Sequence, residues 1–503
     1  MRSNIFLVSL GLLWPTLGHS ATLSNLSSIL TSDDIHWSSN TVVAFPNSTA
    51  FFNATERSNN FGRPIFGASI TPANEDDVVL AVKTAVKNNI FFLATGARHG
   101  TGLGYSKMDG GIAIDLSNFK AVEPHTNDST VTIGGAAEIR EFADQLSAAG
   151  LMLPGGSCSC PGYTGLAVGG GIGRYYGSLG LVADRMISAR VVTATGDIVQ
   201  ASAEENADLF WGLRGAGANF GIILSATYQA VKKSDHSDGN VLTVDLSYSA
   251  DKAPAYFALA ESLADELPGN VAAIHFVRYN ATVDQAELFA NWVWFGPEEE
   301  GRDFIAQFIN LEPYAVANYV YIQANELNGV AGNGVGQNEM CVPGIYANTY
   351  SSNQKVYTAS VFQNIIDSLD DFYHSNPQAL TSVAELSLFP NEAVASLGDD
   401  FNAYPWRDTK AFFSITTSYT DAGLQNQTLL DLSDQFSAAL RDDWRETGGY
   451  KENGGACYIN YSRGDESLQI IYGDKLPQLV ELKKKWDPNN VFAIKNPIPT
   501  SLS

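Results

Sequence analysis

The chain has 503 residues, of which 54 are acidic and 30 are basic, and a formal net charge of −24. Hydrophobic residues make up 45% of it, enough for a large buried core, which excludes disorder and fibrous structure as the main state. The acidic excess argues against a nucleic-acid partner and an anionic membrane surface, because both require clustered Lys and Arg. The length allows about two to four domains, or one large discontinuous fold.

The first twenty residues predict a secretory signal peptide. Arg2 is a basic start, residues 5–13 are apolar, and small residues precede Ala21. No later apolar run reaches the ~18 residues that a membrane span requires, so no membrane anchor is expected. With the Asn-x-Ser/Thr sequons, this pattern predicts a glycosylated protein that is secreted or held in the endomembrane lumen. The sequon residues are Asn25, Asn47, Asn53, Asn127, Asn280, Asn426 and Asn460.

Up to about residue 235 the sequence alternates helical patterns with short strands. The apolar and capping patterns predict one helix that begins near 71–77 and a second helix over 138–150. Strands are predicted at 91–94, 112–114, 131–133, 188–194, 198–201 and 222–228. Glycine-rich loops lie between them, at 96–104, 154–180 and 211–221. This half is therefore expected to be α+β, with glycines where loops meet strands.

After a polar junction at 234–239 the character changes. Alternating patterns at 242–246 and 272–277 predict strands, and 427–444 predicts an amphipathic helix. A second junction at 451–455 precedes a predicted strand at 456–461, a helix near 475–485 and a proline-rich tail. Two junctions divide the chain into a first part, a middle part and a short last part.

Several common catalytic motifs are absent. The glycines at 171, 173 and 177, and those at 215, 217 and 221, do not form GxGxxG, and the sequence holds no GxxxxGK[ST], HExxH or GxSxG. Its histidines are scattered, and Cys158-Ser159-Cys160 has no second pair at zinc-site spacing, so no metal site is predicted. The pairing of the four cysteines is left open. The glycine-rich loops can instead bind phosphate through rows of backbone N–H groups, without any basic side chain, or they simply form tight turns.

The sequence of these loops resembles that of the berberine-bridge-enzyme-like flavin oxidases, in particular their fungal secreted branch. These enzymes have the vanillyl-alcohol-oxidase and p-cresol-methylhydroxylase type of FAD fold. Four motifs occur in the family's order within 63–231 and 457–499. The first is Gly96-Ala97-Arg98-His99-Gly100, and the resemblance implies that His99 bonds to the 8α-methyl of FAD. The family has Arg four residues before this histidine and Gly-Gly directly before it, where this chain has Thr95 and Ala97-Arg98.

The second motif places Cys158 where the family's cysteine can bond to flavin C6. The spacing to the following glycines matches, although Ser159 replaces a proline. The alternatives for Cys158 are a disulfide or a free buried thiol. By resemblance, the cofactor-binding residues of the first two motifs are Thr95, Gly96, Ala97, Arg98, His99, Gly100, Gly156, Cys158, Gly165, Gly169, Gly170, Gly171 and Gly173.

The third motif is 213–221, and the fourth is Tyr458-Ile459-Asn460-Tyr461 with 485–492. The resemblance implies that Tyr461 is the catalytic base and that Asn460 contacts the flavin; the alternative for Tyr461 is a half-buried strand tyrosine. A flavin contact would leave the Asn460 sequon without a glycan. Asp408 is a weaker catalytic candidate, with a surface ion pair to Arg407 as its alternative.

The resemblance implies an α+β fold with a two-part FAD-binding domain and an α+β substrate domain that has an antiparallel sheet. The expected division is a signal peptide at 1–20, the FAD domain at 21–235 and 456–503, and the substrate domain at 236–455. The implied function is an FAD-dependent oxidase of a small molecule of secondary metabolism, with hydride transfer to flavin N5 and reoxidation by O2 to H2O2. FAD is expected to be covalent through His99, and also through Cys158 if the second bond forms.

Two rival functions stay open. One is an oligosaccharide oxidase, for which Trp292, Trp294, Tyr314, Tyr319 and Tyr321 could line a groove, although a packed core suits them equally well. The other is a redox-silent flavoprotein that templates a cyclisation. The sequence does not predict the oligomeric state.

Overall fold

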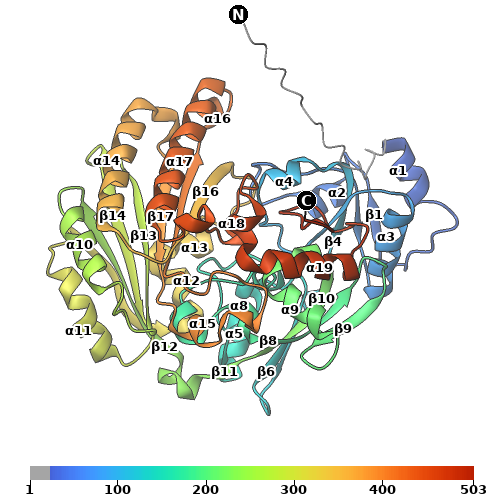
Figure 1. Ribbon diagram of the computed structural model, residues 1–503, viewed down its shortest axis with the longest axis horizontal. Helices are drawn as coiled ribbons and strands as arrows, with labels where there is room; N and C mark the ends of the chain where they lie inside the picture. The colour runs from blue at the N-terminus through green and yellow to red at the C-terminus, as the bar shows by residue number, and fades with distance from the viewer. Residues whose placement is uncertain (1–22, 503) are drawn as a thin grey trace, which may run out of the picture.

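The structure is a computed structural model that describes residues 23–502, so the predicted signal peptide lies outside the described residues. In this range the chain forms two halves that lie side by side (Figure 1). One half holds three small sheets and the C-terminal helices, and the other is built on one large antiparallel sheet. This combination confirms the predicted α+β fold with an antiparallel sheet. No helix among the described residues is both long enough and apolar enough to cross a membrane.

The first small sheet has the strand order β1-β2-β4-β3, with three parallel strands and an antiparallel edge. Its strands are β1 (Val42–Ala44), β2 (Ile65–Thr71), β3 (Phe92–Thr95) and β4 (Asp109–Asp115). The predicted first helix is α3 (Glu75–Lys87), which connects β2 to β3; Asn74 caps it by accepting from the N–H of Asp77. Its apolar face, with Val78 and Val82, packs on the sheet beside Ile112. This crossover fixes where the loop after β3 emerges.

The second sheet is antiparallel, in the order β5-β6-β10-β8-β9. Its strands are β5 (Val122–His125), β6 (Thr130–Gly134), β8 (Met186–Val192), β9 (Ile198–Ser202) and β10 (Ile222–Gln229), while β7 (Leu151–Met152) and β11 (Val231–Lys232) form a separate pair. Helices α5 (Ile139–Ala148), α9 (Ala207–Ala216) and α19 (Leu476–Trp486) flank it. Leu479 of α19 shares a core cluster with Val131 and Tyr228, so the end of the chain packs into the first half (Figure 1).

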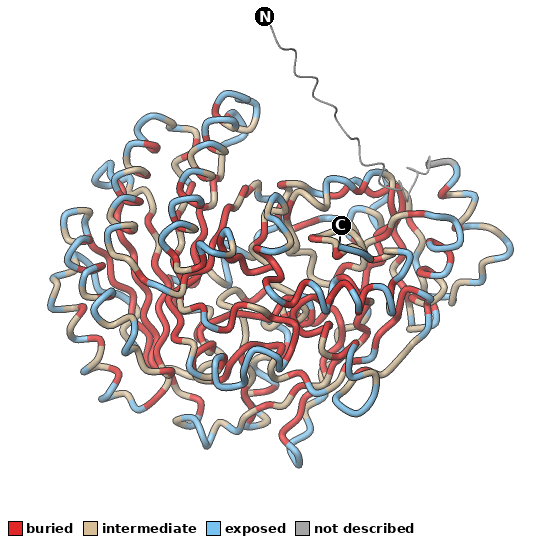
Figure 2. Tube along the Cα trace, in the orientation of Figure 1, coloured by how far each residue is buried: buried red, intermediate tan, exposed pale blue. Residues whose placement is uncertain are grey.

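The large sheet has seven strands in the order β15-β12-β14-β13-β17-β18-β16. They are β12 (Asn240–Ser249), β13 (Val271–Asn280), β14 (Gln285–Trp294), β15 (Ala315–Gln323), β16 (Ala347–Gln354), β17 (Val383–Leu388) and β18 (Ala411–Ser418). The helices α10 (Ala253–Leu263), α11 (Glu298–Ile309), α14 (Ala359–Ser375) and α17 (Gln427–Thr447) cover one face. The strands are mostly buried, and the helices are exposed on their outer sides (Figure 2).

The two faces of this sheet differ in chemistry because strand side chains alternate. The helix-covered face is a hydrophobic core that contains Trp292, Trp294 and Phe413. On the other face, Asp245 lies between the core residues Val244 and Leu246, and Glu385 lies between Ala384 and Leu386. The uncovered face therefore presents polar side chains toward the other half of the molecule.

Two local predictions were wrong. Residues 456–461 do not form a strand, because their backbone groups bond to scattered partners: Cys457 N–H donates to Ile470, and Tyr458 N–H donates to the side chain of Asn353. The segment ends instead in a single 3-10 turn, η9 (Ile459–Tyr461). The loop predicted at 211–221 begins later, because α9 continues until its helical geometry breaks at Arg214 and Gly215.

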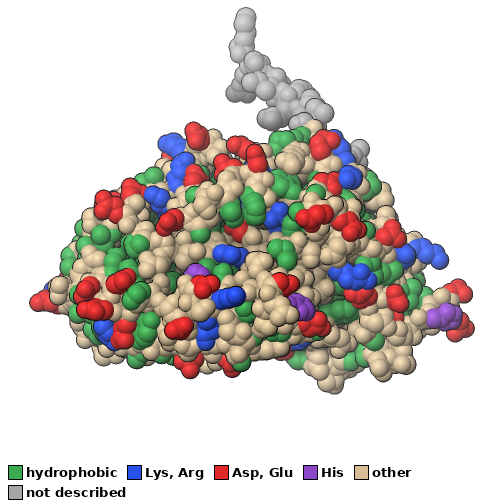
Figure 3. All heavy atoms as spheres, turned by 90° about the horizontal axis from the view of Figure 1, so that it is seen from below, with side chains coloured by type: hydrophobic (Ala, Val, Ile, Leu, Met, Phe, Trp, Pro, Cys, Tyr) green, Lys and Arg blue, Asp and Glu red, His purple; other side chains and the backbone are tan. Residues whose placement is uncertain are grey.

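A buried ion pair joins the two halves. Asp184, in the short helix α8 (Val182–Arg185), lies 2.7 Å from Arg407, and their side chains are 2% and 1% exposed. Arg407 comes from the segment between β17 and β18. Acidic and basic side chains on the surface are interspersed, without one dominant patch on the face seen in Figure 3. The Asp184–Arg407 pair is therefore a specific internal contact and not part of a general charge pattern.

Asp184→Ala should destabilise the protein strongly, because the guanidinium of Arg407 would stay buried without its carboxylate. Removing one partner of such a pair costs about 3–5 kcal/mol. The matched control is Asp265→Ala, which removes a surface pair to Lys410 whose side chains are 87% and 29% exposed; the expected cost is about 1 kcal/mol or less. Thermal unfolding of both variants measures the difference, and equal shifts in the midpoint would contradict it.

Candidate active site

The loop after β3 carries the first motif. Thr95 ends the strand and is buried, while Gly96, Ala97, Arg98, His99 and Gly100 are half-buried. Among residues 23–502, none of the backbone N–H groups of 96–100 donates to a protein acceptor. Such a row of free N–H groups is a concave site for an anion. The loop therefore fits the phosphates of FAD.

Arg98 explains how this loop tolerates the departure from the family's Gly-Gly. Its φ is +60°, in the left-handed region that glycine favours. Its side chain is anchored by an ion pair of 2.9 Å to Asp115 at the end of β4. The backbone conformation expected of glycine is thus kept by a side chain held from the neighbouring strand.

His99 lies among positive charges. Burial and, to a lesser degree, the charges of Arg140, Arg57 and Arg98 lower its pKa to about 4. The imidazole is therefore neutral at neutral pH, with a free lone pair. That is the form in which a histidine can act as a nucleophile or bond to another group.

Arg57 differs from its two cationic neighbours in having no acidic partner within residues 23–502. Arg98 pairs with Asp115, and Arg140 lies 2.7 Å from Glu138. Arg57 is 5% exposed, donates through Nη2 to the carbonyl of Gly100, and leaves Nη1 without a hydrogen bond among the described residues. A buried, uncompensated guanidinium thus adjoins the loop of free N–H groups. Backbone N–H groups alone were expected to suffice here, and the structure adds this charge.

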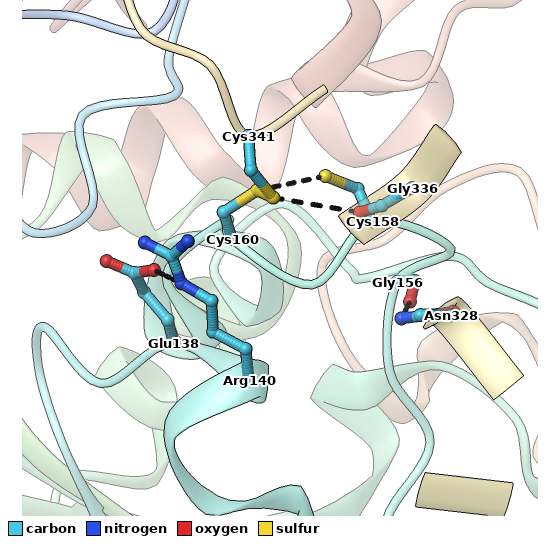
Figure 4. Close-up of a disulfide and its surroundings, with 8 residues drawn as sticks. All are labelled: Glu138, Arg140, Gly156, Cys158, Cys160, Asn328, Gly336 and Cys341. Carbon is cyan, nitrogen blue, oxygen red and sulfur yellow. Dashed lines mark hydrogen bonds and ion pairs between the residues drawn. A yellow bond between two sulfur atoms is a disulfide. The ribbon is translucent and has the colours of Figure 1, made fainter. Parts of the chain in front are cut away.

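The second motif begins with another row of free donors. The N–H groups of 155–158 find no protein acceptor in the described chain. Gly156 and Cys158 are half-buried, and Cys158 is a free thiol. Cys160 forms a disulfide with Cys341 (Figure 4). Within residues 23–502, Cys158, Cys160 and Cys341 are the one group of three His, Cys, Asp or Glu side chains close enough to share a metal, and two of its sulfurs are bonded to each other.

The later glycines of the second motif have a different role. A Cβ on Gly169 would lie 2.5 Å from the side chain of Asn460, one on Gly170 2.6 Å from Tyr404, and one on Gly173 1.9 Å from the carbonyl oxygen of Gly155. The N–H of Gly171 donates to the hydroxyl of Tyr458. These glycines permit close packing of protein on protein. Gly165 is instead exposed, with no atom near the position of a Cβ.

The third glycine-rich loop also serves packing. The N–H groups of Gly215 and Gly217 both donate to the carbonyl of Val168. A Cβ on Gly215 would lie 2.4 Å from the backbone nitrogen of Tyr404. Within residues 23–502, rows of N–H groups without a protein acceptor therefore lie in the first loop, at the start of the second and at 173–175. Fewer loop residues can therefore bind the cofactor through free N–H groups than the three glycine-rich loops suggested.

The fourth motif brings the C-terminal segment against the second. Asn460 donates to the carbonyl of Leu166 (3.2 Å) and to the hydroxyl of Tyr458 (2.8 Å). The backbone carbonyl of Tyr461 accepts from the hydroxyl of Ser351 on β16 (3.0 Å). Asn460 is thus engaged on its amide nitrogen, and Tyr461 is fixed between the large sheet and the glycine-rich segment.

Two further charged residues lie near Tyr461. Burial raises the pKa of Tyr461 well above its usual value, the charge of Glu385 raises it further, and the charge of Arg174 opposes that rise. In the strand register, Glu385 pairs with Ser414, and Ser414 pairs with Ser351, which holds the carbonyl of Tyr461. Glu385 therefore lies in the same cross-strand row as Ser351, whose hydroxyl contacts the backbone of Tyr461.

Arg174 directly follows the glycine-rich motif and is 6% exposed. Its guanidinium donates to Asn291 (3.1 Å) and Asn328 (3.4 Å), both neutral, and its Nε has no partner in the described chain. Burial lowers its pKa to about 10, so it stays charged at neutral pH. Burial also raises the pKa of Glu385, opposed by a hydrogen bond from Ser387 and by the charge of Arg174.

The sequence interpretation missed Glu385 and Arg174. The available signals were a lone acid in the alternating strand 383–388 and a cation immediately after Gly173. Tyr461 and Glu385 are two groups that can exchange a proton, and Arg174 is a fixed positive charge within electrostatic range of both. This combination can accept a proton and stabilise the negative charge that proton loss leaves.

The structure does not bring Asp408 to this group. Its carboxylate is 57% exposed, faces Lys355 at 3.6 Å and accepts from the hydroxyl of Tyr450. The surface pair with Arg407 is not formed either, because Arg407 turns inward to Asp184. Asp408 does not line the cavity of about 860 Å³ that opens beside the site. This cavity is lined by Gly155, Gly156, Arg174 and Tyr175 and by residues of α5.

Comparisons with known proteins agree with this geometry. Residues 67–202 match the FAD binding domain family, and residues 457–499 match the berberine and berberine-like family. The chain is 40% identical to the FAD-linked oxidoreductase fogF of Aspergillus ruber, over 99% of both chains.

Solved structures share the fold. Physcomitrella patens BBE-like 1 superposes with a TM-score of 0.79 at 20% identity, covering 92% of this chain and 98% of that one. An Acremonium strictum glucooligosaccharide oxidase, whose structure is described as revealing a novel flavinylation, has a TM-score of 0.79 at 20% identity and covers 92% and 97%.

Arg57→Met should reduce the amount of FAD that the purified protein carries by several-fold, because it removes the buried charge beside the free N–H row. Arg63→Met is the matched control, since Arg63 lies six positions away on the surface and contacts only Asn60. The ratio of flavin to protein absorbance measures the effect. Full flavin content in Arg57→Met would show that the backbone donors suffice.

Proposed function

The chain belongs to the berberine-bridge-enzyme-like family of FAD-linked oxidoreductases, and from this we propose that it is an oxidase of a small organic molecule of secondary metabolism. The observation that carries the proposal is the group of Tyr461, Glu385 and Arg174. Tyr461 lies within electrostatic range of Cys158, as Cys158 does of Arg140 and Arg140 of His99, which supports one site shared by proton-transfer groups and cofactor-binding residues.

In this proposal, the free N–H groups of 96–100 and 155–158 hold FAD, with Arg57 beside them. His99 would hold it through a covalent bond, and Cys158 through a second where that bond forms. When bound, FAD supplies the hydride acceptor at N5 and the route by which O2 becomes H2O2. The protein contributes binding, orientation and electrostatics.

Tyr461 is proposed as the proton acceptor. Its high pKa makes the neutral phenol the resting form, so it accepts a proton only if its own proton has first been passed on. Glu385 is the nearby group able to take that proton, because its pKa is raised and its charge acts on Tyr461. The fixed charge of Arg174 stabilises whichever of the two is the anion.

The oligosaccharide oxidase is the second candidate, supported by the fold shared with the glucooligosaccharide oxidase. The aromatic residues that could have lined a sugar groove speak against it. Trp292 is fully buried in the helix-covered core, and Trp294 is 8% exposed there. Tyr314 is 57% exposed, on the edge strand side of the sheet. A peroxide assay on cello- and chito-oligosaccharides, run against phenolic secondary metabolites, separates the two candidates.

Secretion and N-glycosylation are part of the proposal. Five of the sequon residues are exposed: Asn25, Asn47, Asn53, Asn127 and Asn426. Asn460 is engaged inside the protein and is expected to carry no glycan. The Cys160–Cys341 disulfide supports an oxidising compartment.

The covalent attachment predicts that acid-precipitated protein stays yellow. His99→Ala should release FAD into the supernatant or leave it bound through Cys158 alone, because the imidazole no longer offers its lone pair. His125→Ala, an exposed histidine on β5, is the control and should retain the flavin. A colourless precipitate from the unmodified protein would refute the covalent bonds.

Tyr461→Phe should slow reduction of the flavin by substrate by ~10²-fold or more if its hydroxyl is the base. Glu385→Gln should remove the acid limb of the rate–pH profile, since a carboxylate with a raised pKa loses its accepting form as the pH falls through that pKa. Stopped-flow absorbance measures both, with the exposed Tyr314→Phe as control. Unchanged reduction in Tyr461→Phe together with slow reduction in Glu385→Gln would transfer the role of base to Glu385.

A further inference from the structure

Three sulfur atoms meet where the two halves join. The disulfide Cys160–Cys341 links the second glycine-rich motif to the segment after α13 (Val335–Asn338), across 181 residues of sequence. The thiol of Cys158 points at this disulfide, with its Sγ 3.5 Å from the Sγ of Cys160 (Figure 4). A free thiol in contact with a disulfide sulfur is the starting arrangement for exchange.

We propose that Cys158 attacks Cys160 in an internal thiol–disulfide exchange that moves the bridge from Cys160–Cys341 to Cys158–Cys160. The sulfur of Cys158, having lost its proton, forms a bond to Sγ of Cys160 while the bond from Cys160 to Cys341 breaks. Cys341 leaves with the electron pair and takes up a proton. The number of disulfides is unchanged, so no oxidant or reductant is consumed.

The geometry favours Cys160 as the sulfur attacked and Cys341 as the leaving group. The backbone of 157–160 is bent, which brings the side chains of Cys158 and Cys160 to one side. The departing Sγ of Cys341 already lies 3.7 Å from the carbonyl of Gly336, to which a new thiol can donate (Figure 4).

The loop stays in place during this exchange because other contacts hold it. The N–H of Ser159 donates to the carbonyl of Gly336 (2.9 Å), and Asn328 donates to the carbonyl of Gly156 (3.2 Å). Gly336 also packs closely on the loop, since a Cβ there would lie 2.3 Å from the carbonyl oxygen of Ser157. Both arrangements of the disulfide can therefore form on one backbone.

The groups around Cys158 set the pH dependence. Burial raises the pKa of its thiol and the charge of Glu385 adds to this, while the N–H groups of Cys160 and Ser159 and the charge of Arg140 oppose it. The charge of Arg140 is itself paired with Glu138. Because the thiolate is the attacking form, the rate should rise about tenfold per pH unit up to that pKa.

The exchange matters for the proposed function, on which this consequence rests. One sulfur cannot bond both to flavin C6 and to Cys160. The bridge Cys160–Cys341 leaves Cys158 available as the second flavin tether, and the bridge Cys158–Cys160 withdraws it. The disulfide arrangement then decides whether the flavin is held by one covalent bond or two.

The test uses the purified full-length protein without added thiol. Samples held at about pH 6 and about pH 9 are trapped with a maleimide, digested with trypsin and mapped by mass spectrometry. Exchange should release the Cys341 peptide as an alkylated, unlinked peptide, faster at the higher pH, and leave an internal disulfide in the peptide of Cys158 and Cys160. Cys158→Ser should abolish this release at both pH values while keeping the original bridge. Cys457→Ser, which removes the other free cysteine, should not change it.

Two separate readouts distinguish failure of the exchange from failure of the flavin tether. A Cys341 peptide that stays linked to Cys160 at both pH values, in the fraction of protein whose Cys158 peptide carries no flavin, would overturn the exchange. Flavin absorbance on the Cys158 peptide tests the tether independently. Release of Cys341 without any flavin on Cys158 would support the exchange and remove its proposed consequence.

Discussion

A row of backbone N–H groups without protein acceptors, at 96–100, is the constraint on which the site depends. Unpaired polar groups are costly to bury, so these half-buried N–H groups need an acceptor from outside the protein. Their surroundings favour an anionic one. Arg98 holds the left-handed backbone from β4, Arg57 adds a buried charge, and burial together with the neighbouring cations keeps His99 neutral. A chain with a net charge of −24 can therefore bind a polyanion, because the positive charge it needs is local and internal.

Sequence patterns predicted well those helices and strands that are determined by residues close together in the sequence. Helix α3 follows from its cap and its apolar spacing, and the strands around the first two loops follow from short apolar runs. The predicted strand at 456–461 failed because its partners are Ile470 and the side chain of Asn353, neither of which a local pattern contains. The glycine-rich loops were located correctly, but only the structure separates glycines beside free donors from glycines that allow close packing.

The polar face of the large sheet explains why half of the candidate site was not predictable. Glu385 is one acid in a short strand, and nothing near it in sequence indicates that it lies in the row of Ser351, whose hydroxyl contacts Tyr461. That proximity depends on the register of β16, β17 and β18 and on a contact between Ser351 and Tyr461, which are 110 residues apart. Motif matching finds residues that share a loop, as with His99 and Cys158, but a strand residue becomes part of a site only through tertiary pairing. Arg174 lies between these two cases. It adjoins a motif in the sequence, but contacts to Asn291 and Asn328, which are distant in sequence, hold its side chain.

The position of the C-terminal segment has a consequence for the order in which the protein is made. Tyr461 arrives after the large sheet, and Leu479 and Val480 complete a hydrophobic core begun by Val131, more than three hundred residues earlier. During synthesis, the part of this core that Val131 begins therefore stays open until α19 has been made. The proposed base likewise joins the site only after the strands of the large sheet have been made. A premature stop near the end would remove the proposed base and leave exposed apolar surface for chaperones to recognise.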